Sequence, residues 1–153
     1  MKCVICTALI FVFCAAAGMP AIAQSELGPG SAQLINPEDF LLILQAPKSE
    51  KPLILNVGPH LLYMQAHIPS AEYIGPGSDS QGIQSLRRRV KTLPRQTFIV
   101  LYCGCCPWSR CPNVRPAYNE LRKMGFTNVK VLYIADNIGT DWVDQGYPTI
   151  KGQ

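Results

Sequence analysis

Three short runs of apolar residues, separated by segments with helical features, constrain the fold of this chain most strongly. The runs cover residues 53–57, 98–102 and 129–134. Continuous apolar runs of this length, bounded by turn residues, are typical of strands buried on both faces of a sheet. Strands that alternate with helices predict an α/β fold with a central, mainly parallel sheet flanked by helices.

The segments between the runs carry start and stop signals for helices. Asn36 is expected to cap a helix that begins at Pro37, with Glu38 and Asp39 in its first turn. Gly125 is expected at the position just past the end of a later helix, where glycine is favoured. Further helical segments are expected over residues 59–66, 83–93, 117–124 and 139–145.

The N-terminus has the layout of a secretory signal peptide. Lys2 precedes an apolar, uncharged stretch over residues 3–18, and Pro20 interrupts the pattern before the small residues Ala21 and Ala23. We expect cleavage after Ala23 and a secreted or periplasmic protein without stable membrane insertion; the alternative is an uncleaved membrane anchor. The expected divisions are a signal peptide over residues 1–23, a linker over 24–33 and one domain over 34–151.

The cysteines of the expected mature chain are concentrated in one loop. Of the seven cysteines, three would be removed with the signal peptide, and the other four lie within nine residues. An exported protein meets an oxidising compartment, and four cysteines allow three full pairings, between which the sequence does not choose. The cluster indicates a site rather than a scaffold of disulfides. Its members are Cys103, Cys105, Cys106 and Cys111.

Four segments, in order along the chain, carry a resemblance to a known family. They are the run 53–57 with a helix after it, the turn His67-Ile68-Pro69-Ser70-Ala71, the run 98–102 ending at Cys103, and the closing Gly139, Trp142 and Gly146-Tyr147-Pro148. Together they resemble the rhodanese family over about residues 34–151. The resemblance implies a three-layer α/β fold with a central, mainly parallel sheet flanked by helices.

The chain departs from the family pattern at two places. Asn56-Val57-Gly58 stands where the family has Asp-x-Arg, so a charge pair that often braces the site is missing. The cysteine loop is also longer than the family's, and Pro112 and Pro116 are expected to delay the helix that follows it. Cys103 matches the family's catalytic cysteine by its position at the strand end, whereas Cys105 matches by its spacing to Arg110.

The resemblance implies sulfur transfer at this loop. In the family a cysteine thiolate takes sulfane sulfur from a donor, becomes a persulfide and passes the sulfur to a thiophilic acceptor. Cys103 would be the nucleophile, with Cys105 as the alternative; Gly104 would let the backbone approach closely; and Arg110 and Arg115 would hold an anionic donor. The expected partners are a donor such as thiosulfate and a thiol or cyanide acceptor, without a cofactor or an assigned metal ligand. The oligomeric state is not predicted.

Other functions remain open from the residues alone. Cys105, Cys106 or Cys111 could resolve a persulfide on Cys103, which would make the protein a thiol–disulfide redox device. The four thiolates could instead bind a soft ion such as Cu(I) or Zn(II), although their spacing matches no common zinc pattern. A structural disulfide in a catalytically inactive module is a further alternative. A formal charge of +4 is too mild to indicate nucleic-acid binding.

Overall fold

The computed structural model of the chain describes residues 29–47 and 50–152. The expected signal peptide and the first residues of the expected linker lie outside this range. Within the linker, Ser31–Gln33 forms a single 3-10 turn, η1. In the described part of the chain, no helix is both long enough and apolar enough to cross a membrane.

The strands of the described residues form one parallel sheet of five strands in the order β1-β5-β4-β2-β3. This confirms the predicted α/β class, and β4 occupies the middle of the sheet. The edge strand β1 was not expected because two residues are too few to form a recognisable pattern. The strands are β1 (Leu34–Ile35), β2 (Leu53–Asn56), β3 (Glu72–Tyr73), β4 (Ile99–Tyr102) and β5 (Val129–Leu132).

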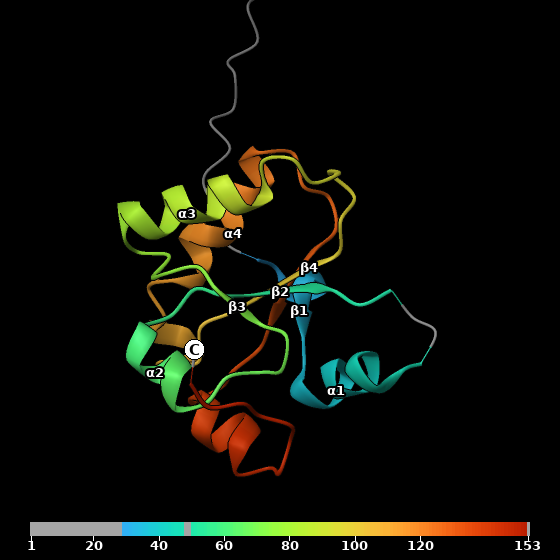
Figure 1. Cartoon of the computed structure of the whole chain (residues 1–153), viewed down its shortest axis with the longest axis vertical. Coiled ribbons are helices and arrows are strands. Elements are labelled where there is room, and N and C mark those ends of the chain that lie inside the picture. Colours follow the sequence, from blue (N-terminus) through green and yellow to red (C-terminus); the bar gives the residue numbers. More distant parts are fainter. Residues whose placement is uncertain (1–28, 48–49, 153) are drawn as a thin grey trace, which may run out of the picture.

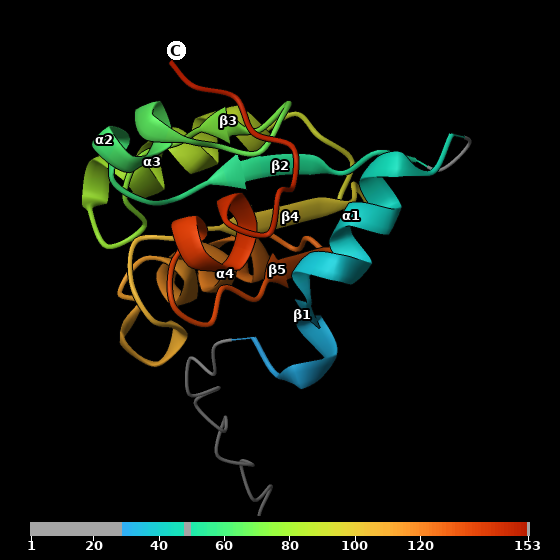
Figure 2. The same cartoon turned by 90° about the horizontal axis from the view of Figure 1, so that it is seen from below.

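Helices cover both faces of the sheet, as the three-layer prediction requires. α3 (Ser80–Val90) and α4 (Val114–Lys123) lie on one face, while α1 (Pro37–Gln45) and the π-helical turn η3 (Gly139–Val143) lie on the other (Figures 1 and 2). Alternate residues of each central strand join the two separate apolar clusters. Both strand faces are therefore buried, which explains why these strands read as continuous apolar runs.

Two helices begin earlier than the sequence indicated. α3 starts at Ser80 because the Asp79 carboxylate accepts the backbone N–H of Gln81 at 3.1 Å and caps the helix. α4 starts at Val114, so the expectation that Pro116 delays this helix was wrong. A proline is tolerated in a first helical turn because the N–H that it lacks has no partner within the helix there.

The closing segment packs into the core beside α1. Trp142 is fully buried, its indole N–H donates to the carbonyl of Pro148 at 2.9 Å, and its ring contacts Phe40 and Tyr147. After this turn the chain returns to α2 (His60–Gln65) through a backbone pairing of Ile150 with the predicted turn. The segment therefore has a structural role in the core.

His67 also has a structural environment. Its imidazole Nδ1 lies 2.9 Å from the carbonyl oxygen of Tyr63, and its ring stacks on the Tyr63 ring with centroids 3.9 Å apart. Its backbone exchanges two hydrogen bonds of 2.9 Å with Ile150. His67 therefore joins α2 to the closing segment of the domain.

Candidate functional site

The central strand places Cys103 at the carboxyl edge of the sheet. β4 ends at Tyr102, and the next residue, Cys103, is only 4% exposed. Ligand sites in parallel sheets gather at this edge, outside the carboxyl ends of the strands. The position of Cys103 at the strand end is the one that the resemblance implied.

The loop after Cys103 is held against the segment that follows β5. Gly104 has a φ of +71°, and a Cβ placed there would lie 2.7 Å from the Cβ of Ile138, so the backbone conformation and the close approach both require glycine. The carbonyl of Gly104 accepts the N–H of Ile138 at 3.0 Å. Further along the loop, the N–H of Trp108 donates to the carbonyl of Ala135 at 3.0 Å. Gly104 therefore permits a close approach between its own backbone and Ile138 of the same chain.

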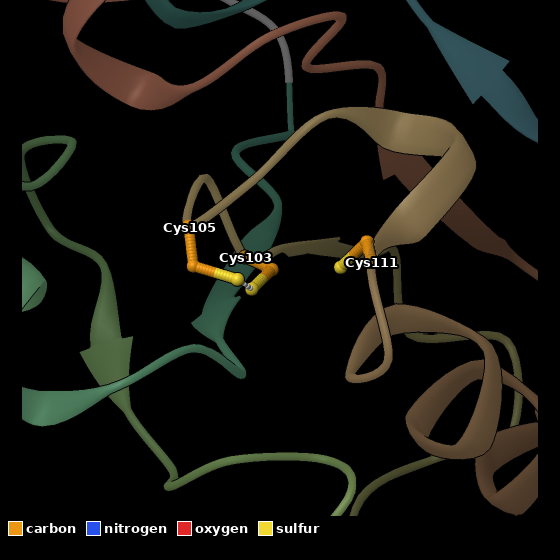
Figure 3. Close-up of side chains that lie close together, drawn as sticks. All are labelled: Cys103, Cys105 and Cys111. Atoms are coloured by element: carbon orange, nitrogen blue, oxygen red, sulfur yellow. Dashed lines mark hydrogen bonds between the residues drawn. The ribbon is translucent and has the colours of Figure 1, made fainter.

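Three sulfur atoms converge inside this loop. The Sγ atoms of Cys103, Cys105 and Cys111 all lie within 4.8 Å of one another, and their side chains point toward a common centre (Figure 3). The thiol of Cys103 donates to Cys105 Sγ at 3.1 Å, and Cys105 Sγ lies 3.0 Å from Cys106 Sγ. The four cysteines of the loop are free and form no disulfide with one another. The group is compact enough for sulfur exchange between neighbours, and also for one soft metal ion.

Asn113 contacts the sulfur cluster from the residue before α4. Its side chain is buried, and its amide Nδ2 donates to Cys103 Sγ at 3.3 Å and to Cys105 Sγ at 3.7 Å. Its Oδ1 accepts the backbone N–H and the hydroxyl of Ser78 at 3.1 and 2.8 Å. Because a backbone N–H can only donate, this contact fixes which end of the amide faces the sulfurs. Sequence reasoning missed Asn113.

The protons are unequally distributed among the cysteines. The hydrogen bond with Cys111, followed by burial, raises the pKa of Cys103 above its usual range. The same hydrogen bond lowers the pKa of Cys111 to about 5, and backbone N–H groups of Asn113 and Val114 at the start of α4 add to the effect. Partial burial and the contact with Cys105 raise the pKa of Cys106 to about 12. The lowered pKa of Cys111 therefore favours its thiolate form, whereas the raised pKa of Cys103 favours its thiol form.

This distribution predicts selective alkylation. At neutral pH iodoacetamide is expected to modify Cys111 before Cys106, because only the thiolate is nucleophilic. Acidification should slow the reaction at Cys111 with a midpoint near pH 5, since the thiol form predominates below its pKa of about 5. Peptide mapping of samples quenched at successive times measures both rates. Urea-unfolded protein is the control, and modification of Cys106 first in the folded protein would contradict the assignment.

Two different clefts reach the cluster. Cys105 and Cys106 line a cleft of about 760 Å³ together with Gly104 and Ile138. Cys111 lines a smaller cleft of about 440 Å³. Cys103 lines neither of the two.

The two predicted anion-binding arginines flank Cys111. Arg110 lies in the 3-10 turn η2 (Trp108–Arg110) and Arg115 in the first turn of α4; both are exposed and line the smaller cleft. Within residues 29–47 and 50–152, neither forms an ion pair. The structure therefore brings both arginines to Cys111 and not to Cys103.

A neutral contact stands where the resembled family has its charge pair. The buried Asn56 side chain accepts the N–H of Gly58 at 3.0 Å. A Cβ at Gly58 would lie 2.8 Å from the carbonyl oxygen of Cys103 and 3.1 Å from its Sγ, so glycine leaves room for the cysteine. The missing charge pair is thus replaced by a tight turn against Cys103.

The chain packs tightly against Gly77 behind the site, and this predicts a stability effect. A Cβ there would lie 2.1 Å from the backbone oxygen of Asn113, so Gly77→Ala must displace that residue. We expect a loss of about 3 kcal/mol in the free energy of unfolding, measured by urea denaturation. The matched control is Gly146→Ala, where a φ of +73° but no atom within 4 Å predicts a loss of about 1 kcal/mol. Equal losses for the two variants would contradict this reading.

Comparison with known proteins assigns the family. Residues 37–133 match the family model of the rhodanese-like domain, so this chain belongs to the rhodanese-like domain family. The matched segment contains the whole cysteine loop. No curated protein matches the chain.

Several solved structures share the fold. The rhodanese-like domain of the Alr3790 protein from Anabaena sp. is 22% identical, with 78% of this chain and 79% of that domain covered and a TM-score of 0.57. The BH2092 protein from Bacillus halodurans is also 22% identical, with 76% and 75% covered and a TM-score of 0.58. A thiosulfate sulfurtransferase from Pseudomonas aeruginosa is 21% identical with a TM-score of 0.53, and the match covers 78% of this chain but 20% of that enzyme. These similarities establish the fold.

Proposed function

We propose that this protein is a sulfurtransferase that carries sulfane sulfur as a persulfide on Cys103. The observation that carries the proposal is the surroundings of this thiol at the end of β4: an amide N–H donor from Asn113 and a neighbouring thiolate on Cys111. Membership of the rhodanese-like family and the likeness to a thiosulfate sulfurtransferase support this choice of reaction class.

The contacts of Cys103 suit both its reaction as a nucleophile and its persulfide form. When Cys103 becomes a nucleophile, its proton passes to the neighbouring Cys111, whose lowered pKa favours the thiolate form that can accept it. When Cys103 carries the additional sulfur, the buried Asn113 amide can donate to the persulfide anion. Overall, thiosulfate and the Cys103 thiol give the Cys103 persulfide and sulfite, and an acceptor such as cyanide then restores the thiol and leaves as thiocyanate.

The test is turnover of the reduced protein with thiosulfate and cyanide, followed as thiocyanate. We expect catalytic formation of thiocyanate, which exhaustive alkylation of the cysteines abolishes. A rate no higher than that of the alkylated control would contradict the proposal. Disulfide cycling without added sulfur, or a stoichiometric soft metal ion in the purified protein, would then favour the redox or metal-binding alternative.

We also propose that the protein is exported. The support is the N-terminal pattern of Lys2, an apolar stretch and the small residues before Gln24. N-terminal sequencing of protein from the periplasm or medium of an expressing bacterium is expected to begin at Gln24. Recovery of the uncleaved chain in the membrane fraction would instead support the anchor.

A further inference from the structure

The two clefts at the cysteine loop differ in the chemistry that they offer. In the smaller one, Cys111 shares the lining with Arg110 and Arg115, whose guanidinium groups suit a small anion. In the larger one, Cys105 shares a mainly apolar lining that includes Leu62 and Ile138, and the opposite charges of Asp136 and Lys151 lie in the same lining. That cleft suits a bulkier organic molecule.

The sulfur atoms connect the two clefts through the interior. Cys111 faces the smaller cleft, Cys105 faces the larger one, and the buried Cys103 lies within 4.8 Å of both sulfurs. Figure 3 shows Cys103 and Cys105 in contact, with Cys111 on the opposite side. Because Cys103 is only 4% exposed, a neighbouring cysteine is better placed than Cys103 to meet a dissolved molecule.

We propose that sulfane sulfur is loaded onto Cys111 in the smaller, basic cleft, passes to the buried Cys103, and leaves from Cys105 to an organic thiol bound in the larger cleft. This relay rests on the proposed function and adds to it a donor side, an acceptor side and a direction. The donor class is a small sulfur oxyanion such as thiosulfate, and the acceptor class is a thiol.

Each step conserves atoms and electrons. The Cys111 thiolate attacks the outer sulfur of thiosulfate, the S–S bond of thiosulfate breaks, and sulfite leaves. Cys103 then attacks the outer sulfur of the Cys111 persulfide, its proton passes to Cys111, and the sulfane sulfur stays on Cys103. Cys105 takes the sulfur in the same way, and an acceptor thiol removes it as its own persulfide. No step needs an oxidant or a reductant.

The distribution of charge agrees with the direction of the first transfer, from Cys111 to Cys103. Thiol exchange is faster when the leaving thiol has the lower pKa. The hydrogen bond with Cys103 and the start of α4 lower the pKa of Cys111, whereas the pKa of Cys103 is raised. Cys111 is therefore the better leaving group of the pair, and Cys103 the stronger nucleophile once it has lost its proton.

The test separates loading from discharge in two variants of the reduced protein. Cys111→Ser is expected to gain sulfur from thiosulfate at least about tenfold more slowly than the wild type. Cys105→Ser is expected to gain one sulfur normally but to release it to glutathione at least about tenfold more slowly. Intact mass, recorded at successive times, follows both steps.

A second donor shows whether Cys111→Ser is folded and competent. Glutathione persulfide should load this variant at the wild-type rate, because an organic persulfide reaches Cys105 through the larger cleft. In parallel, the double variant Arg110→Gln, Arg115→Gln should raise the KM for thiosulfate at least about tenfold. Arg88→Gln, a matched loss of charge on the exposed face of α3, should leave this KM unchanged.

The outcomes distinguish the relay from the function on which it rests. A wild-type protein that gains no sulfur would overturn the proposed function. Normal loading of Cys111→Ser by thiosulfate, in a wild type that does gain sulfur, would overturn the relay and leave sulfur transfer standing. The relay would also be overturned if Cys111→Ser failed to load from glutathione persulfide. Normal discharge of Cys105→Ser to glutathione would overturn the relay as well.

Discussion

Cys103→Ser is expected to lower the rate of thiocyanate formation from thiosulfate and cyanide by at least about a thousandfold. A hydroxyl group cannot carry sulfane sulfur in place of the thiol, and the substitution also breaks the path between Cys111 and Cys105. Serine is small enough for the buried position beside Gly58 and can still accept the Asn113 amide N–H. The rate of thiocyanate formation measures the effect directly.

The control for this variant is its folding. Cys103→Ser should keep a cooperative urea unfolding transition, since the replacement fits the space of the thiol. Turnover at more than a tenth of the wild-type rate would contradict the assignment of Cys103 as carrier. It would favour Cys105, the cysteine that matches the family by its spacing to Arg110.

Trp142→Ala is expected to cost about 3–5 kcal/mol in the free energy of unfolding, the largest stability effect that we predict. The indole is fully buried, contacts Phe40 and Tyr147, and donates to the carbonyl of Pro148. Its removal leaves a cavity and an unpaired carbonyl at the point where the closing segment meets α1. Urea denaturation at equilibrium measures the loss.

Val143→Ala is the matched control in the same π-helical turn. Its side chain is 36% exposed, so the loss should stay below about 1 kcal/mol. Similar losses for Trp142→Ala and Val143→Ala would mean that the closing segment contributes little to the core.

Much of the fold follows from local sequence patterns. Continuous apolar runs located β2, β4 and β5, and Asn36-Pro37 located the first residue of α1, as the structure confirms. Gly125 also has the positive φ, +89°, expected at the end of a helix. These features depend on neighbours along the chain, which the sequence displays directly.

The errors concern features that depend on contacts across the fold. β1 is a strand only because β5 lies beside it, and α4 begins three residues before the position expected from its apolar pattern. The side-chain cap by Asp79 was not anticipated, although an aspartate before a helix is a readable signal.

The candidate site shows the same difference between features that depend on local sequence and features that depend on contacts across the fold. The position of Cys103 could be predicted because a strand leads directly into it. The role of Asn113 could not, because its partner Ser78 is 35 residues away in the sequence. The lowered pKa of Cys111 depends first on its contact with Cys103 and then on the backbone N–H groups at the start of α4. One local signal was overlooked: Cys103 and Cys106 have the Cys-x-x-Cys spacing in which thiol pKa values are often shifted.

The most direct measurement is the intact mass of the reduced protein after exposure to thiosulfate, with fragmentation of the cysteine-loop peptide. We expect a gain of one sulfur atom, located within the loop on Cys103 or its neighbours Cys111 and Cys105, and its complete removal by cyanide. A protein that gains no sulfur, or that carries cyanide-removable sulfur outside this loop, would contradict the account.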